Sequence, residues 1–278
     1  MKKIIVPVDF SEHSEYALKA AAKFAAKFKA EILALHMLEM TDAMLTASEG
    51  FSSEQAVFFV KLAEQRFEKF LKKDYLNNVK VTPIIKHFKV FSEVNDVAAK
   101  HDADLIIMGS QGTSGVAEFF IGSNTERVVR HADIPVLVLK DELKDVNFKT
   151  ATFACSFTEE SIPSYLKAEK LMQTLGCKLH LVHVNRPNDL FKSSDEMEKL
   201  AVNFFTKAKK NLNDMKSVHF VADYSVEDGI LNFSKKIDTD LIIIATHGRK
   251  GLSNFFVGSI GEDVANHSNR PVLTFKIS

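Results

Sequence analysis

Two stretches of the sequence decide the fold: "GTSGVAEFFIGSNTE" (residues 112–126) and "GRKGLSNFFVGSIGE" (residues 248–262) repeat one unusual phrase. Their flanks repeat as well: "DADLIIMG" (102–109) and "ADIPVLVLK" (132–140) surround the first copy, and "DTDLIIIA" (238–245) and "SNRPVLTFK" (268–276) surround the second. An internal repeat of this length indicates that one structural unit was duplicated. The sequence therefore predicts two similar domains in tandem.

The size and composition of the chain agree with a duplicated globular domain. The 278 residues are enough for two domains of ordinary size, which we place at residues 1–141 and 148–278. Hydrophobic residues make up 46% of the chain, so each domain can bury a core. Lys plus Arg equals Asp plus Glu at 36 each, which argues against a nucleic-acid partner, because duplex binders normally carry a basic face. No apolar run is long enough for a signal peptide or a membrane helix, so we expect a cytoplasmic protein.

Strand and helix patterns alternate along each repeat, since short β-branched apolar runs predict strands and amphipathic patterns predict helices. In the first repeat the expected strands cover 3–8, 31–38, 80–88, 104–109 and 135–140. Of the expected helices, the first has Ser11 or Ser14 as its N-cap, the second begins near Glu54, and the other two cover 94–101 and 123–131. In the second repeat the same patterns predict strands at 150–157 and 178–184 and place 205–212 in a long helix. The alternation predicts, for each repeat, an α/β fold with a doubly wound parallel sheet between two layers of helices.

The two repeats differ in length between their second and fourth strands. His36 matches His183 at an offset of 147, whereas Asp104 matches Asp240 at an offset of 136. Eleven residues are therefore missing from the second repeat. We expect the loss in a surface loop and in the long helix, because surface connections tolerate changes of length.

The glycines of the first repeat suit a phosphate-binding loop. In a doubly wound sheet, ligands bind at the carboxyl ends of the strands where the strand order reverses. Gly109 ends a strand, and its missing Cβ would let a ligand approach the backbone. Gly112 and Gly115 permit turns in which successive N–H groups point at one anion. Gly122 and Ser123 begin a helix, whose free N–H groups and dipole favour phosphate.

The full set of motifs resembles the universal stress protein family. The spacing Gly109-x2-Gly112-x9-Gly122-Ser123 is combined with "VPVDFSEHS" (6–14) at the start of the repeat and "IPVLVLK" (134–140) at its end. The likeness covers nearly the whole chain, in tandem, and the ATP-binding form of the motif is complete in the first repeat. It implies two Rossmann-like domains of the adenine nucleotide alpha hydrolase type.

By this resemblance the first repeat would bind ATP, with or without Mg²⁺. The triphosphate would lie on the glycine loop, with Ser123 and Thr125 adding hydroxyl donors, and Asp9 would accept hydrogen bonds from the nucleoside. The nucleotide-binding residues implied are Pro7, Val8, Asp9, Met37, Met108, Gly109, Gln111, Gly112, Gly122, Ser123, Asn124 and Thr125. The expected function is that of a nucleotide-responsive regulatory or stress-resistance protein.

The resemblance also implies how the two repeats associate. Family members pair through their last strand, so strands 135–140 and 271–277 would pack the repeats as an internal pseudo-dimer. Covering an exposed sheet edge is expected on physical grounds as well. The sequence leaves open whether two chains form a homodimer, which signal the protein answers, and whether ATP is preferred over AMP or other nucleotides.

Each of these residue types also has a plain structural explanation. Glycines between a strand and a helix are commonly turn residues, Asp9 could cap a helix, and Met37 and Met108 could fill the core. The aromatic side chains that we assign to the core or to an interface are Phe58, Phe59, Phe67 and Phe70. His36 and His183, at matching strand positions, are expected to be buried and hydrogen-bonded, and no Cys/His spacing suggests zinc.

The second repeat keeps the pattern of the fold and loses parts of the nucleotide pattern. Aligned with Pro7, Asp9, Gly109 and Thr125 are Ala154, Ser156, Ala245 and Gly261, whereas Gly248, Gly251, Gly258 and Ser259 are kept. Arg249 and Lys250 could still attract phosphate, but exposed cations contribute little when they are screened. We therefore expect nucleotide binding mainly in the first repeat.

Two other classes of function stay open beside a nucleotide-binding regulator: a slow ATPase or nucleotide-dependent enzyme, and a ligand-independent interaction scaffold. No G-K-[ST] sequence supplies a P-loop lysine, and no carboxylate pair or Ser/His arrangement emerges from the spacing. We expect no catalytic residue, no metal ligands and at most weak ATPase activity. Cys155 and Cys177 would lie at opposite ends of neighbouring strands, roughly 15 Å apart at about 3.3 Å per residue, which is too far for a disulfide.

Overall fold

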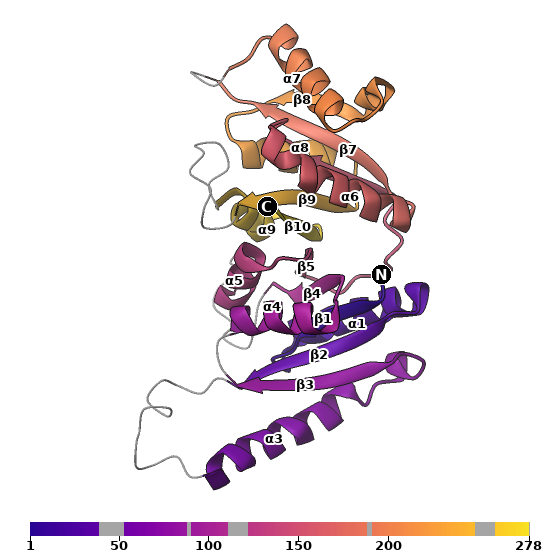
Figure 1. Ribbon diagram of the computed structural model, residues 1–278, viewed down its shortest axis with the longest axis vertical. Coiled ribbons are helices and arrows are strands. Elements are labelled where there is room, and N and C mark those ends of the chain that lie inside the picture. The colour runs from indigo at the N-terminus through magenta and orange to yellow at the C-terminus, as the bar shows by residue number, and fades with distance from the viewer. Residues whose placement is uncertain (39–52, 88–89, 111–121, 188–190, 248–258, 278) are drawn as a thin grey trace. The chain divides into compact units, whose positions relative to one another are not determined.

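The computed structural model describes residues 1–38, 53–87, 90–110, 122–187, 191–247 and 259–277 (Figure 1). Two of the predicted site residues, Gln111 and Gly112, lie outside these ranges, as do Gly115, the four residues 248–251 and Gly258. The chain divides into two compact units, Met1–Val146 and Asn147–Ser278. Strands and helices alternate in both, which confirms the α/β class.

The first unit contains a parallel sheet with the strand order β3-β2-β1-β4-β5. Its strands are β1 (Lys3–Pro7), β2 (Glu31–Leu38), β3 (Val81–His87), β4 (Leu105–Gly109) and β5 (Val136–Leu139). The α-helices that connect them are α1 (Glu12–Phe28), α3 (Ser53–Leu71), α4 (Val90–His101) and α5 (Ser123–His131), with a short 3-10 helix at Asp74–Leu76. The chain moves outward from β1 to β3 and then crosses back to β4, so the strand order reverses between β1 and β4. That reversal is the doubly wound switch point.

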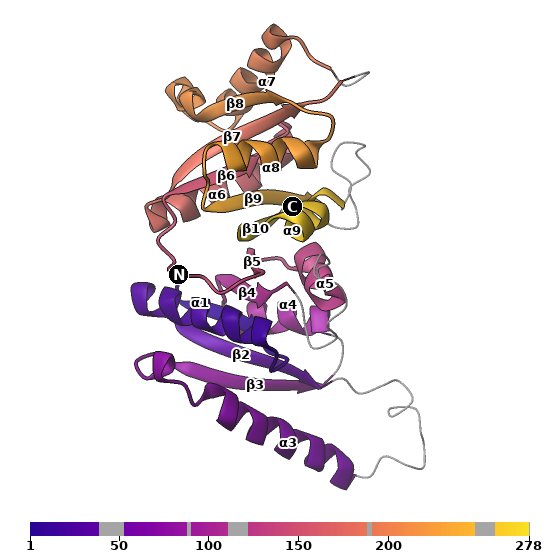
Figure 2. The same ribbon diagram turned by 180° about the vertical axis from the view of Figure 1, so that it is seen from behind.

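Helices cover both faces of the first sheet: α4 lies in front of the strands in Figure 1, and α1 lies in front of them in the reverse view of Figure 2. The central strands are buried on both sides, with Ile4, Ile5 and Val6 fully inaccessible to solvent. This explains their unbroken apolar sequence, because a parallel sheet under two helical layers has no polar face. Helix α1 is rich in alanine on its buried side, and small side chains let it pack closely on the sheet.

The second unit repeats this topology, with a parallel sheet of order β8-β7-β6-β9-β10. Its strands are β6 (Thr150–Ala154), β7 (Lys178–Asn185), β8 (Val218–Ala222), β9 (Leu241–His247) and β10 (Val272–Ile277). Its α-helices are α6 (Ile162–Leu175), α7 (Ser194–Lys207), α8 (Val226–Lys236) and α9 (Ser259–His267), with 3-10 helices at Glu159–Ser161 and Leu212–Ser217. The duplication predicted from the sequence is therefore present in the strand order of both units.

Matching hydrogen bonds show that the duplication extends to single side chains. A carboxylate oxygen of Asp104 accepts the backbone N–H of Lys3 at 3.0 Å, and Asp240 accepts that of Thr150 at 3.0 Å. The Nδ1 atom of His36 lies 2.7 Å from the carbonyl oxygen of Val8, and His183 Nδ1 lies 3.0 Å from that of Cys155. The repeated Asp ties the start of the first strand to the fourth, and the repeated His ties the first strand to the second. The predicted hydrogen bonds of the two strand histidines are confirmed, whereas both side chains are half-buried and not fully buried as expected.

Some predicted boundaries are wrong. Helix α7 ends at Lys207, so 208–212 lie outside it, and Lys209 takes a left-handed conformation with φ 54° that a continuing helix does not permit. Helix α4 begins at Val90, four residues before the predicted start. Helix α7 has 14 residues where α3 has 19, so part of the missing length falls in this helix, as expected.

The phenylalanines of α3 divide between the core and the surface. Phe67 and Phe70 are buried against Phe10, with ring centroids 5.3 and 5.5 Å away. Phe58 and Phe59 are 61% and 37% exposed. The assignment to core or interface is therefore confirmed for Phe67 and Phe70 only.

The two cysteines are free and buried. Burial disfavours the thiolate and raises the pKa of both Cys155 and Cys177 to about 12, so each behaves as a small apolar side chain at neutral pH. Within the described ranges, no helix has the length and hydropathy needed to cross a membrane.

Candidate functional site

The candidate site of the first unit lies where β1 and β4 end. The N–H of Val8 still donates to Leu35 at 2.8 Å, so the chain leaves the sheet only at Asp9. On the neighbouring strand, the N–H of Ser110 donates to Leu139 at 2.7 Å, so the chain is held to the sheet for one residue beyond the end of β4. These two ends flank the switch point, where a doubly wound sheet leaves a crevice.

Asp9 is held in place by the residue that caps helix α1. Its Oδ1 atom accepts the backbone N–H of Ser11 at 3.0 Å and the hydroxyl of Ser11 at 2.5 Å. The Ser11 hydroxyl oxygen in turn accepts the N–H of Ser14 at 3.2 Å, which is the N-cap interaction of α1. The cap therefore belongs to Ser11, and the half-buried carboxylate of Asp9 positions that cap without being one itself.

The residue after Asp9 has an unusual backbone conformation that recurs in the second unit. Phe10 has φ 66° and its counterpart Phe157 has φ 57°, a region that aromatic residues rarely adopt. Ring contacts hold both residues there: Phe10 lies 4.5 Å from His36 and Phe157 lies 5.5 Å from His183, measured between centroids. Backbone strain of this kind persists only where the surroundings impose it. The sequence gives no signal for it, because the ring partners are distant along the chain.

Gly109 is required by the packing of helix α1. A Cβ atom at this position would lie 2.6 Å from the Cβ of His13 and 2.7 Å from the His13 backbone oxygen. Backbone atoms cannot give way at such distances, so even alanine would force α1 away from the sheet. The glycine is therefore explained by close helix packing, and its contact with a ligand stays a prediction.

The start of helix α5 is tied to the end of β4 by two hydrogen bonds. The N–H of Gly122, the N-cap, donates to the carbonyl of Ser110 at 2.7 Å, and the hydroxyl of buried Thr125 donates to the carbonyl of Gly109 at 2.9 Å. Thr125 thus positions the helix with its hydroxyl hydrogen, and its role toward phosphate stays a prediction. Gly122 has no side chain to cap α5, and the N–H groups of Ser123 and Asn124, at an exposed to half-buried helix end, have no partner within the helix.

The structure brings together three groups of the predicted residues. The first group is Pro7, which ends β1, with Val8 and Asp9 directly after it. The second is Met108 and Gly109, which end β4. The third is the N-cap Gly122 with Ser123, Asn124 and Thr125 in the first turn of α5. Met37, near the end of β2, is 8% exposed, and Met108 is 4% exposed. Both methionines belong to the core under α4 and α5, so they could touch a ligand only with their outermost atoms.

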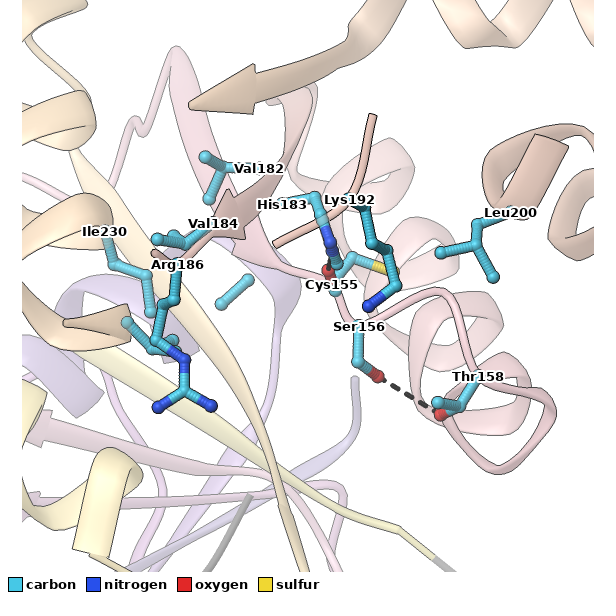
Figure 3. Close-up of a pocket in the computed structure, with 12 residues that line it drawn as sticks. Cys155, Ser156, Thr158, Val182, His183, Val184, Arg186, Lys192, Leu200 and Ile230 are labelled. Atoms are coloured by element: carbon cyan, nitrogen blue, oxygen red, sulfur yellow. Dashed lines mark hydrogen bonds between the residues drawn. The ribbon is translucent and has the colours of Figure 1, made fainter. Parts of the chain in front are cut away.

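The second unit has a cavity of about 180 Å³ at the carboxyl ends of β6 and β7 (Figure 3). Ala154 and Ser156, the counterparts of Pro7 and Asp9, line it. Ser156 carries no charge and shares a hydrogen bond with Thr158 at 3.1 Å between hydroxyl oxygens. Among the residues that the structure describes, no group of three His, Cys, Asp or Glu side chains could hold a metal ion.

Comparison with known proteins agrees with this geometry. The family model described as "Universal stress protein family" matches twice, over residues 1–140 and 147–276. The chain belongs to the universal stress protein family. The tandem arrangement inferred from the glycine phrases is thereby shown at the level of the whole chain.

Individual relatives of this universal stress protein match either one repeat or both. Universal stress protein MJ0531 of Methanocaldococcus jannaschii is 31% identical over 144 residues, which cover 52% of this chain and 85% of the relative. Universal stress protein Slr1230 of Synechocystis is 22% identical over 300 residues, which cover 99% and 100%. The crystal structure of a universal stress protein from Archaeoglobus fulgidus superposes with a TM-score of 0.65 at 20% identity, covering 99% and 98%. At that identity the structural match shows the fold alone.

The residues around the two sites differ in how far sequence motifs indicate them. Ser11 follows Asp9 by two positions, a spacing typical of a local turn closed by an Asp side chain, so the sequence does contain a signal for this contact. His13 and Ser110 carried no signal, because their partners Gly109 and Gly122 contact them only in the folded chain. In the second unit, Arg186 and Lys192 stand in no recognisable motif, although they line the cavity there.

Proposed function

We propose that the first unit binds ATP, with or without Mg²⁺, and that the protein is a nucleotide-binding regulator. The observation that carries the proposal is the junction of β1, β4 and α5. There a fixed carboxylate, Asp9, and a helix start capped only by glycine, Gly122, both belong to the switch point. A carboxylate suits the hydrogen-bond donors of a nucleoside, and free helix N–H groups suit a phosphate.

The residues present fit a nucleotide in two parts. Pro7, Asp9 and the outer atoms of Met37 and Met108 would hold the adenosine. The backbone N–H groups at the start of α5 would hold phosphate oxygens, assisted by the dipole of this nine-residue helix. Glu126, the acidic residue of its first turn, is paired with Arg130 at 2.9 Å, which reduces its repulsion of an anion.

Ligand-dependent stability tests the proposal. ATP at about 100 times its dissociation constant should stabilise the binding unit by roughly 2.7 kcal/mol. For a domain of this size the melting temperature should rise by about 2–4 °C for each kcal/mol. A thermal scan with millimolar ATP, with and without Mg²⁺, should show this rise. An unchanged melting temperature in both conditions would contradict nucleotide binding.

The same scan with ADP and AMP tests the phosphate half of the site. If the start of α5 holds the outer phosphates, ATP should stabilise the protein more than AMP at equal concentration. Equal stabilisation by ATP and AMP would mean that α5 contributes nothing to nucleotide recognition.

A further inference from the structure

The cavity of the second unit has the lining of a small-molecule binding site. Its lining residues are Ala154, Cys155, Ser156, Thr158, Val182, His183, Val184, Arg186, Lys192, Leu200, Val226 and Ile230. They come from β6, β7, α7 and α8, and from the segments next to them. Apolar side chains predominate and a few polar groups are placed at defined points, which is the usual composition of small-molecule sites.

The volume of the cavity limits the size of the apolar body that it can hold. Its volume is about 180 Å³. An apolar cavity of about 150 Å³ in another protein stays dry and binds benzene. The walls formed by Val182, Val184, Leu200 and Ile230 therefore suit a body of about one aromatic ring.

Lys192 gives the cavity a fixed positive charge. Its backbone is clamped by the buried amide of Asn185, which donates to the Lys192 carbonyl at 2.8 Å and accepts the Lys192 N–H at 2.9 Å. In the view of Figure 3 the ammonium group points toward Ser156, whose hydroxyl is bonded to that of Thr158. Within the described residues, the side chain of Lys192 forms neither an ion pair nor a hydrogen bond. One hydroxyl hydrogen of this pair is used in the bond between them, so the ammonium and one hydroxyl, turned toward a ligand, can donate hydrogen bonds to one anionic group.

One described carboxylate lies near Lys192. Glu196 accepts the N–H of Ser193 at 2.7 Å in the capping box of α7, and this bond, with a smaller contribution from the charge of Lys192, lowers its pKa and keeps it charged. His183 is kept neutral, because burial, and then the charge of Lys192, lowers its pKa. Arg186 also lines the cavity, beside Val184, and Figure 3 shows its guanidinium on the other side of the cavity from Lys192. Among the described residues that line the cavity, the two that carry a formal charge, Arg186 and Lys192, are both cations.

Comparison with the first repeat shows that two residue positions of this region differ in charge between the repeats. Asp9 is replaced by Ser156, and Glu39 is replaced at the same offset of 147 by Arg186. Two acidic positions of the first repeat have become a neutral donor and a cation. A ligand that presents donors to a carboxylate, as a nucleoside does, finds a hydroxyl at Ser156 where the first repeat has the carboxylate of Asp9.

We propose that the second unit binds a small organic anion, with an apolar body of about one aromatic ring in the cavity and a carboxylate or phosphate at Lys192, Ser156 and Thr158. Arg186, on the far side, adds attraction at longer range. The site is separate from the nucleotide site proposed for the first unit.

Calorimetric titration of the full chain with three probes of equal body tests the proposal: benzoate, phenyl phosphate and benzyl alcohol. Ligands of this size can reach dissociation constants of about 1 mM. At least one anion should bind in that range, and benzyl alcohol should bind at least about 10-fold more weakly, because it cannot form the charge-assisted hydrogen bond. The stronger of the two anions identifies the head group.

Variants assign the binding to this cavity. Lys192→Gln should weaken binding of the anion by about 10- to 100-fold and leave binding of benzyl alcohol unchanged. Arg186→Gln should weaken binding of the anion less than 10-fold. The matched control is Lys199→Gln, which removes an exposed lysine of α7 paired with Asp195 and should change neither probe. Leu200→Trp, which fills the cavity, should abolish binding of all three probes.

Four results would overturn the proposal. The first is that neither anion binds at tens of millimolar. The second is that benzyl alcohol binds as well as the anions. The third is that Lys192→Gln leaves anion binding unchanged. The fourth is that ATP displaces the anion from the Asp9→Ala variant, because the second unit would then be a nucleotide site. None of these results bears on ATP binding by the wild-type first unit.

Discussion

The two units build the same scaffold and present opposite chemistry at the ends of their first strands. Asp104 and Asp240 form the same backbone hydrogen bond, and Phe10 and Phe157 share the same rare backbone conformation. One position of the candidate site differs sharply: a fixed carboxylate stands at Asp9, and an uncharged hydroxyl stands at Ser156. The scaffold was thus retained after duplication, while this position of the candidate site diverged.

The same comparison shows that neighbouring changes are coupled. Gly109 is pressed against His13 of α1, whereas its counterpart Ala245 accommodates a methyl group. The region that matches His13 lies in a 3-10 turn at Glu159–Ser161, and α6 begins only at Ile162. The helix start and the strand end have therefore changed together.

At a second pair of positions, the larger and the smaller side chain have changed places between the two units. Thr125 reaches the carbonyl of Gly109 beside the small Ser110 in the first unit. In the second unit Thr246 and Gly261 stand at the matching positions, and a Cβ on Gly261 would lie 3.0 Å from the Thr246 methyl carbon. The loss of a hydroxyl at Gly261 therefore follows from packing, and it is weaker evidence for loss of a ligand than the change from Asp9 to Ser156.

The largest expected effect in this comparison is that of Asp9→Ala on ATP affinity. A hydrogen bond to a charged group contributes roughly 1.5–3 kcal/mol, so ATP should bind about 10- to 150-fold more weakly. Ser156→Ala is the matched control and should leave ATP affinity unchanged. Isothermal calorimetry on both variants measures the difference. Equal effects of the two substitutions would remove the distinction between the units.

The next effect concerns stability. Gly109→Ala should destabilise the first unit by about 1–3 kcal/mol, because the new methyl group meets the backbone of His13. Ala245→Gly should cost the second unit less, about 0.5–1 kcal/mol, through backbone entropy alone. Urea unfolding of both variants gives the two values. If Gly109→Ala proved as mild as Ala245→Gly, the close packing of α1 would be refuted.

The smallest effect is a pH dependence expected in the second unit. Burial lowers the pKa of His180, His183 and His219, and the charge of Lys178 adds to the effect at the first and third. Because the unfolded chain binds these protons more readily, stability should be complete above about pH 6.5 and fall as the pH drops below that value. His180 Nδ1 lies 2.9 Å from His219 Nε2, a contact that two charged rings cannot keep.

Hydrogen exchange at pH 7.5 and pH 5.5 measures this loss strand by strand. Amides of β7 and β8 should lose protection at the lower pH. The double variant His180→Gln with His219→Gln should lose less. Unchanged protection in the wild-type protein would contradict the expected role of the histidines.

Much of the fold could be predicted because its signals are local. The bounds of β2 and α5 follow from apolar periodicity and from glycine at the helix start, and the repeated phrase indicates the duplication. Other features depend on contacts between distant residues, so no local pattern contains them. The left-handed Phe10, the contact of Gly109 with His13, and the cavity beside Lys192 are of this kind. The end of α7 at Lys207 was missed because the helical pattern continues beyond it.

The stoichiometry of ATP binding tests the asymmetry of the two units most directly. Titration of the full chain should saturate near one ATP, and that site should be weakened by Asp9→Ala and blocked by Gly122→Val. Two tight, equivalent sites would contradict the account. One site that survives both substitutions and is lost on altering Gly258 would place nucleotide binding in the second unit instead.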